Sequence, residues 1–171
     1  TLTVSCPNLA RVIAFGDYTE TEILRTAACL EEHFPHSVAK AIVRAAEEKD
    51  LKHREEHAEV EYIVAHGIAT KLHGQKAIIG SAHFVFDDEK IPVTDAQTKE
   101  IKALGEQYSM VYLAVGGTLC GVLCIEDPVR ENAVAVIAKL KQKGIRNIMM
   151  ITGDGESTAK CVCEKLGIPK Y

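Results

Sequence analysis

The chain has 171 residues, of which 24 are acidic and 20 are Lys or Arg, so its formal net charge is −4 at pH 7. This charge excludes the strongly basic surface typical of nucleic-acid-binding proteins, and no nucleic-acid partner is expected. The sequence also has no apolar run near the roughly 18 residues that a membrane span requires. It begins without Met and without the features of a signal peptide, so we expect a piece cut from a longer protein.

The six cysteines do not have the spacing of a disulfide framework. Four of them lie inside apolar runs, which predicts reduced, buried core residues: Cys29, Cys120, Cys161 and Cys163. One residue separates Cys161 from Cys163, whereas a zinc knuckle normally has two between its cysteines. The seven histidines show no recognisable ligand spacing either, so we expect no metal site in this chain.

The first part of the chain predicts one strand and two helices. Residues 9–15 form a short apolar run that ends at Gly16-Asp17. Thr19 and Glu22 have the spacing of a capping box, which predicts a helix to about residue 32. Pro35 ends that helix, and a second begins near Ser37. Residues at helical spacing are expected in the core: Ile23, Leu24, Ala27, Ala28, Leu30, Val38, Ala41, Ile42, Ala45 and Ala46.

The middle of the chain predicts an antiparallel sheet. Residues 51–59 are mostly charged, which indicates a loop or a frayed helix end. Strands are expected at 60–65, 68–72, 76–79, 110–115 and 118–125, with turns at 66–67, 73–74 and 116–117. A second capping box at residues 94–97 predicts a helix to about residue 107. We therefore expect an antiparallel sheet over the first 125 residues, with its helices on one side.

The pattern changes after Asp127-Pro128. Residues 132–143 predict an amphipathic helix closed by Gly144, and residues 147–151 form an apolar run typical of a buried parallel strand. A glycine-containing loop at 152–155 and a helix to residue 166 follow. Strand, loop and helix make half of a doubly wound α/β fold, whose other strands must lie elsewhere in the parent protein. The expected class is α+β: an antiparallel sheet flanked by helices, with an incomplete α/β segment.

Three features suggest ligand chemistry, and each has a structural alternative. The loop at 152–155 follows a buried strand and precedes a helix, a place suited to phosphate, but it could equally be a plain connection. His36 could stack on a purine, a contact worth about 1–3 kcal/mol, or simply cap a helix. Gly67 and Gly80, each at the end of a β segment, could admit a ligand close to the backbone or could form ordinary turns.

In this order, the pieces resemble the cytoplasmic nucleotide-binding region of heavy-metal (class IB) P-type ATPases. Residues 30–42 resemble the stretch around the family's adenine-binding His-Pro pair, with His36 in the His position, Glu31 in that of the nucleotide-site Glu and Ser37 replacing Pro. Residues 65–68 resemble its Gly-x-Gly-Ile loop, with Ala65 replacing the first glycine, and residues 79–81 resemble a strand end followed by Gly-Ser.

Further segments that resemble motifs of this family lie at the start of the chain and in its last third. Thr1-Leu2-Thr3 is similar to the last residues of the phosphorylation motif, residues 127–130 to the Asp-x-x-Arg hinge motif, and residues 151–154 to the Thr-Gly-Asp motif. The implied nucleotide-binding residues are Glu31, His36, Ser37, Gly67, Ile68, Gly80 and Ser81. The implied phosphate-side and hinge residues are Asp127, Arg130, Thr152, Gly153 and Asp154.

The resemblance implies three regions: a hinge with a motif remnant at 1–8, a nucleotide-binding domain at 9–125, and part of a haloacid-dehalogenase-like phosphorylation domain at 126–171. It implies an ATP-binding, cytoplasmic fragment of a heavy-metal-transporting integral membrane protein. The fragment's partners would be ATP and the remaining phosphorylation, actuator and transmembrane domains, with Mg²⁺ acting in the complete phosphorylation domain. The phosphorylated Asp would precede Thr1, so we expect no catalytic residue, no turnover and weak ATP binding, with Kd of about 0.1–1 mM.

Two other functions stay open at this point. A haloacid-dehalogenase-like phosphatase would carry its own nucleophilic Asp in an Asp-x-Asp or Asp-x-x-x-Thr signature after an early strand, and residues 1–15 contain none. A metal-sensing or interaction module would use the His and Cys side chains. Tight stoichiometric zinc or copper binding, lost on replacement of Cys161 and Cys163, would favour that module.

Overall fold

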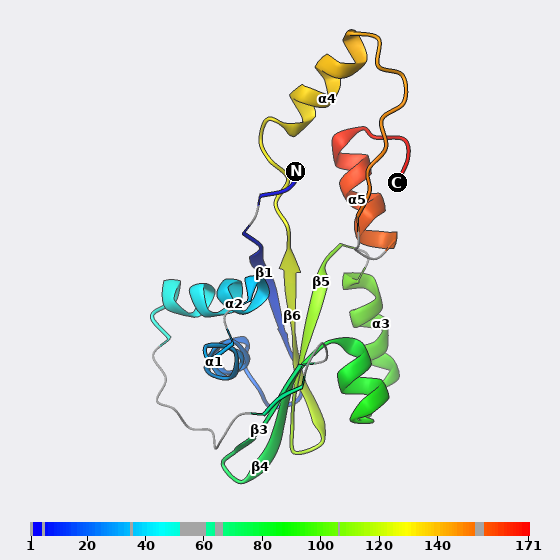
Figure 1. The fold of residues 1–171 in the computed structure, drawn as a ribbon. Coiled ribbons are helices and arrows are strands. Elements are labelled where there is room, and N and C mark those ends of the chain that lie inside the picture. Colours follow the sequence, from blue (N-terminus) through cyan, green and yellow to red (C-terminus); the bar gives the residue numbers. More distant parts are fainter. Residues whose placement is uncertain are drawn as a thin grey trace.

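The computed structural model describes residues 2–4, 6–34, 36–51, 61–63, 67–105, 107–152 and 156–171. Within these residues the strands form one six-stranded sheet in the order β1-β6-β5-β4-β3-β2, and all neighbouring strands are antiparallel (Figure 1). The strands are β1 (Asn8–Ala14), β2 (Glu61–Ile63), β3 (Gly67–Leu72), β4 (Gln75–Gly80), β5 (Ser109–Val115) and β6 (Thr118–Glu126). The predicted antiparallel sheet is confirmed.

Helices cover both faces of this sheet. Helices α1 (Glu20–Glu31) and α2 (Ser37–Glu48) pack on one face, while the π-helix η1 (His83–Asp88) and helix α3 (Asp95–Leu104) lie on the other (Figure 1). The prediction of helices on one side only is therefore wrong. The reason is visible in β6, where every residue between its two ends is buried, with Leu123 in one core and Cys124 in the other. A strand covered on both faces lacks the polar alternation of a half-exposed one.

The local start and turn signals of the sequence are confirmed. Thr19 with Glu22 and Thr94 with Gln97 both form reciprocal capping boxes. The β3–β4 and β5–β6 hairpins turn through residues with positive φ, which are His73-Gly74 and Gly116-Gly117. Helix α3 ends at Leu104 instead of near residue 107, because Gly105 follows as its C-cap.

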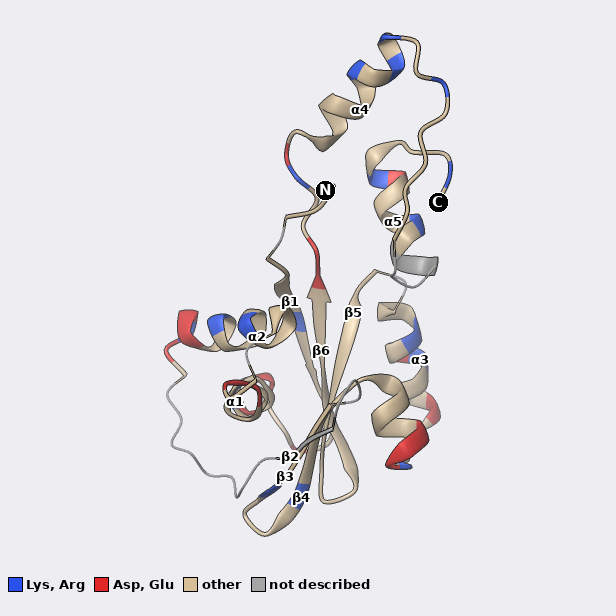
Figure 2. Ribbon diagram, in the orientation of Figure 1, with Lys and Arg blue, Asp and Glu red and all other residues tan. Residues whose placement is uncertain are grey.

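The core also follows the predicted pattern, with exceptions at the edges. The predicted core residues of α1 are buried, as are Ala41, Ile42 and Ala46 of α2, while Val38 and Ala45 are half-buried. None of the six cysteines, all of which lie in the described part of the chain, forms a disulfide: Cys29, Cys120 and Cys163 are buried as predicted, and Cys161 is half-buried. Figure 2 shows basic and acidic residues spread over several elements, in line with the small net charge. The predicted loop at 51–59 lies almost wholly outside the described residues.

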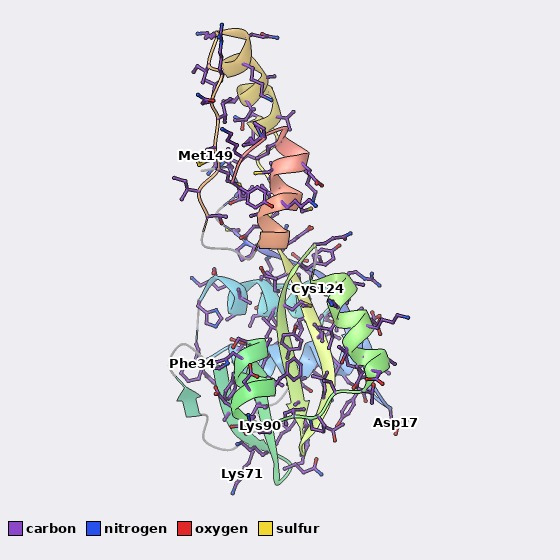
Figure 3. The ribbon with its side chains drawn as sticks, turned by 90° about the vertical axis from the view of Figure 1, so that its right-hand side faces the viewer. Asp17, Phe34, Lys71, Lys90, Cys124 and Met149 are labelled. Atoms are coloured by element: carbon purple, nitrogen blue, oxygen red, sulfur yellow. The ribbon has the colours of Figure 1, made fainter. Side chains whose placement is uncertain are left out.

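Residues 126–171 extend beyond the end of the sheet and have a small core of their own. Helix α4 (Ala133–Gln142) and helix α5 (Glu156–Leu166) match the predicted helices. The predicted strand at 147–151 is wrong for this structure: Met149 forms one isolated bridge with Lys170, and Ile151 is 93% exposed. Figure 3 shows Met149 in the part of the molecule beyond the sheet. A strand needs a neighbouring strand that pairs with it along its length, and among the described residues this run has only the bridge to Lys170.

None of the helices that the structure describes combines the length and the apolar character needed to cross a membrane.

Candidate functional site

The turn between α1 and α2 brings Glu31 and His36 together. Glu31 is the last residue of α1, and His36 is the N-cap of α2, where its Nδ1 accepts a hydrogen bond from the Ala39 amide at 3.2 Å. An accepting Nδ1 carries no proton, so a neutral His36 ring holds its proton on Nε2. This Nε2 lies 3.1 Å from Oε2 of Glu31. His36 therefore caps helix α2, as the structural alternative to purine stacking predicted. The capping hydrogen bond also orients the imidazole ring.

Glu31 is a buried acid with an unsatisfied oxygen. Its side chain is 5% exposed, and its Oε2 makes no hydrogen bond among the described residues, although Nε2 of His36 lies nearby. Burial raises the pKa of Glu31 to about 7 and lowers the pKa of His36 below its ordinary value. Both shifts favour the neutral forms, so at pH 7 the His36 ring is mostly neutral and the Glu31 carboxyl group is about half protonated.

Gly67 and Gly80 also come together, as direct partners in the β3–β4 ladder. Gly80 ends β4 as expected, but Gly67 begins β3 and is not a residue of a separate turn. A Cβ on Gly67 would lie 2.3 Å from the Ile79 carbonyl oxygen and 2.7 Å from Cδ1 of Phe84. The protein's own packing thus accounts for glycine at position 67, whether or not a ligand approaches there.

The other expected adenosine-side residues have local structural roles. The side chain of Ile68 is buried in the core under α1 and α2, so its backbone alone is available to a ligand. Ser81 accepts a hydrogen bond from the Phe84 amide at 3.2 Å at the start of η1. Ser37 is the exposed first residue of α2. Pro35, Ala65 and His66 lie outside the described residues.

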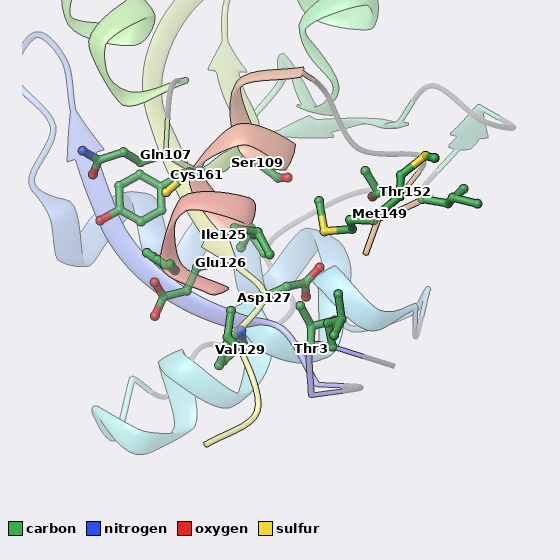
Figure 4. A pocket seen from close by; sticks show the side chains of 17 residues that line it. Thr3, Gln107, Ser109, Ile125, Glu126, Asp127, Val129, Met149, Thr152 and Cys161 are labelled. Atoms are coloured by element: carbon green, nitrogen blue, oxygen red, sulfur yellow. The ribbon is translucent and has the colours of Figure 1, made fainter. Parts of the chain in front are cut away.

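Two of the expected phosphate-side and hinge residues, Asp127 and Thr152, line a separate pocket of about 420 Å³ (Figure 4). Thr3, Asp127 and Thr152 contribute to its lining, together with residues at the ends of β5 and β6 and on α5. Arg130 does not line this pocket; its Nε donates to the carbonyl oxygen of Thr3 at 3.1 Å. The expected residues Gly153 and Asp154 lie outside the described residues.

The structure therefore places the candidate site residues in three separate pairs and not in one cluster. Glu31 is near His36, Gly67 is paired with Gly80, and Asp127 shares a pocket with Thr152. The lining of that pocket includes none of the first four residues. A ligand that contacts all three sets must be extended, with one end near the α1–α2 turn and the other near Asp127.

Comparison with known proteins decides the family. The whole chain, residues 1–171, matches the haloacid dehalogenase-like hydrolase family. The chain belongs to this family. Among curated proteins, the zinc-exporting P-type ATPase of Mycobacterium marinum is 35% identical over 173 residues, which cover 100% of this chain and 23% of that protein. The chain thus spans about a quarter of the length of such relatives, and the predicted resemblance to heavy-metal P-type ATPases is confirmed.

Solved structures support the same assignment for this haloacid dehalogenase-like chain. A zinc-transporting PIB-type ATPase in its E2.Pi state superposes with a TM-score of 0.80 at 26% identity, over 100% of this chain and 27% of that one. The N-domain of HMA8, a copper-transporting P-type ATPase, superposes with a TM-score of 0.62 at 27% identity. That match covers 70% of this chain and 99% of the N-domain.

Sequence reasoning missed two residues that shape the site of this haloacid dehalogenase-like protein. Phe84, on the unpredicted helix η1, fills the space beside Gly67. The apolar run around it, residues 84–86, was a usable signal for a buried element. Arg44 donates a hydrogen bond to the carbonyl oxygen of Pro7, which lies 37 residues earlier in the chain. No local sequence pattern predicts a contact between residues so far apart.

Proposed function

We propose that this chain is the ATP-binding, cytoplasmic part of a heavy-metal-transporting P-type ATPase, an integral membrane protein. The observation that carries the proposal is the similarity of the entire chain to metal-exporting ATPases, at 35% identity with the zinc exporter. The three-region division at 1–8, 9–125 and 126–171 is part of the proposal. It is supported by the separately solved N-domain, which corresponds to 70% of this chain. Partners are the remaining phosphorylation, actuator and transmembrane domains.

The adenosine end of ATP binds at the α1–α2 turn in this proposal. The face of the His36 ring stacks on the purine, since both of its nitrogens already face protein atoms. Glu31 accepts from the adenine amino group or orients the His36 ring, whose Nε2 lies 3.1 Å from its Oε2. The backbone near Gly67 and Gly80 forms the opposite wall. Burial of Glu31 thereby favours a base with an N–H donor at that position.

The triphosphate extends toward Thr152 and Asp127, whose pocket has room for a phosphate group. The phosphoryl acceptor is an Asp outside this chain, so the chain presents the γ-phosphate and does not itself react. No group of three or more His, Cys, Asp and Glu residues in the described part of the chain could hold a metal ion. Mg²⁺, which neutralises phosphate charge in such transfers, would act in the complete phosphorylation domain.

The transported ion is not set by this region. Relatives named for zinc, manganese and copper export match the chain at 35%, 34% and 34% identity, respectively. Because the chain is about equally similar to exporters of different ions, we assign to it the ATP chemistry that these exporters share. Ion selection then belongs to other parts of the parent protein.

Binding is tested by titrating the chain with ATP and following amide signals by NMR, with an expected Kd of about 0.1–1 mM. The informative variant is His36→Asn, because Asn is a good N-cap and keeps α2 capped while the ring is lost. We expect its affinity to fall several-fold with little change in stability. His83→Asn, which alters an exposed His on the opposite face of the sheet, is the matched control. Unchanged affinity in His36→Asn would contradict the pocket.

A second assay separates this proposal from the phosphatase alternative. The chain is offered a generic aryl phosphate in the presence of Mg²⁺. We expect no turnover, because residues 1–15 contain no Asp to serve as a nucleophile after an early strand. Steady turnover would contradict the proposal and favour a phosphatase.

A further inference from the structure

Two chain segments lie between the sheet and residues 130–171, and they are hydrogen-bonded to each other. We define the neck as residues 3–4, 6–8 and 126–130. At the sheet end, Asn8 is paired with Glu126, and at the other end Thr3 forms a bridge with Val129. Between these pairs, the Val4 amide donates to the Pro128 carbonyl oxygen at 2.8 Å. A change in the direction of one segment must therefore affect the other.

Helix α2 contacts this neck through Arg44. One guanidinium nitrogen, Nη2, donates to the Pro7 carbonyl oxygen at 3.0 Å and to Oδ1 of Asn8 at 2.6 Å. Both acceptors lie where the chain leaves the sheet, and α2 packs beside β1 at this place (Figure 1). Nε of the same side chain lies 3.9 Å from the Glu48 carboxylate. Two neutral acceptors held by one cation fix the direction of the neck relative to α2.

The same helix begins at the proposed nucleotide site. His36 is its N-cap, and Arg44 lies eight residues further along, which corresponds to about 12 Å of helix. The helix has no Pro or Gly between these positions, and several of its residues are buried against α1 and the sheet. A short, packed helix moves as a rigid body, so a displacement at its N-terminus reaches Arg44.

We propose that Arg44 is a positioning residue that couples the nucleotide site to the neck. Nucleotide contact at His36 shifts α2, and Arg44 transfers this shift to Pro7 and Asn8 and thereby to the paired segment at 128–130. This inference rests on the proposed function, because it takes the α1–α2 turn as the nucleotide site. Its consequence is that nucleotide binding biases the orientation in which Asp127 and Thr152 meet the phosphate end.

The test follows backbone amide signals of the 171-residue chain during titration with AMP. AMP is chosen because it lacks the terminal phosphates that could touch Asp127 or Thr152 directly. In the wild type we expect shifts at Ala39 and Lys40, near the N-cap, and also at Asn8 and Val129 in the neck. In Arg44→Ala the Ala39 and Lys40 shifts persist with a similar Kd, whereas the neck shifts fall by about twofold or more.

Two controls assign the effect. Lys40→Ala removes one exposed positive charge from the same helix, so it reports the loss of charge without loss of the neck contact. Glu48→Ala removes the other partner of Arg44. Both should keep the neck shifts, and Arg44→Lys should restore part of them, since Lys can still donate to one carbonyl oxygen.

The outcomes separate the two proposals. If AMP and ATP shift no residue of the α1–α2 turn, the proposed function fails, and the coupling fails with it. If the turn responds but the wild-type neck does not, the coupling alone is overturned. Equal neck shifts in Arg44→Ala and the wild type, or an equal loss in Lys40→Ala, also overturn it.

Discussion

Replacement of Gly67 by Ala should destabilise the fold through the β3–β4 ladder. The new Cβ would lie 2.3 Å from the Ile79 carbonyl oxygen and 2.9 Å from the Gly80 Cα, and both are backbone atoms of the neighbouring strand. Overpacking costs about 1–3 kcal/mol when side chains can move aside. Here the strands themselves must separate, which also weakens a ladder hydrogen bond worth about 1 kcal/mol. We expect a loss of about 3 kcal/mol or more.

The measurement is urea unfolding followed by circular dichroism, with thermal unfolding as a second readout. For a chain of 171 residues, about 3 kcal/mol corresponds to a decrease in Tm of roughly 6–12 °C. Gly105→Ala is the matched control, because Gly105 has right-handed φ and its new Cβ would meet the flexible end of Met110 at 3.1 Å. That change should stay within about 1 kcal/mol of the wild type.

A double variant identifies the obstacle. Phe84→Leu in the Gly67→Ala background removes the ring atom at 2.7 Å but leaves the carbonyl contact at 2.3 Å, so it should not restore wild-type stability. Full restoration would show that the ring, and not the strand, excludes a side chain at position 67. A Gly67→Ala variant within about 1 kcal/mol of the wild type would refute the packing argument. ATP binding by Gly67→Ala should be measured at a temperature at which this variant is still folded, so that unfolding is not mistaken for a loss of affinity.

Three further predictions concern a titration, a cap and an ion pair. Because burial raises the pKa of Glu31 to about 7 from an ordinary 4.5, its stabilising effect is complete below about pH 4.5 and is lost as pH rises through about 7. The free energy of unfolding should thus fall by about 2.5 kcal/mol more between about pH 5 and 8 in the wild type than in Glu31→Gln; equal slopes would contradict this. Thr94→Ala removes the capping box of α3 and should cost about 1 kcal/mol in urea unfolding. Lys76→Gln breaks the exposed ion pair with Glu89 and should cost less than about 1 kcal/mol, so a larger loss would mean a role beyond that pair.

The elements confirmed from sequence are those with a local physical cause. Thr19 and Thr94 each begin a helix because their hydroxyl accepts an amide that would otherwise lack a partner. Gly116 and Gly117 turn a hairpin because positive φ is easy for glycine. Each of these signals lies within four consecutive residues, so the rest of the fold does not alter them.

The wrong or missing predictions concern contacts between distant residues. Whether helices cover one face or two depends on which strands lie at the centre of the sheet, and one strand's sequence does not determine this. The run at 147–151 has the composition of a buried strand, but a strand forms only where a neighbour supplies hydrogen bonds. For the site, residues 31–36 were recognised by resemblance, whereas the burial of Glu31 and the missing partner of its Oε2 depend on the packed turn.

Coverage of both sheet faces restricts where a nucleotide can bind. Helices pack on both faces, so we expect a ligand to bind at the rim of the sheet. The register shows which end of the rim is relevant. Gly80 pairs with Tyr112 in the middle of β5, and the other β4 residues pair further toward Val115. Ser109 at the start of β5 pairs with Ile125 near the end of β6. The glycine pair therefore lies toward the neck end of the sheet. An adenosine held between this end and the α1–α2 turn would direct its phosphates toward the pocket that Asp127 lines, which is the direction that phosphoryl transfer requires.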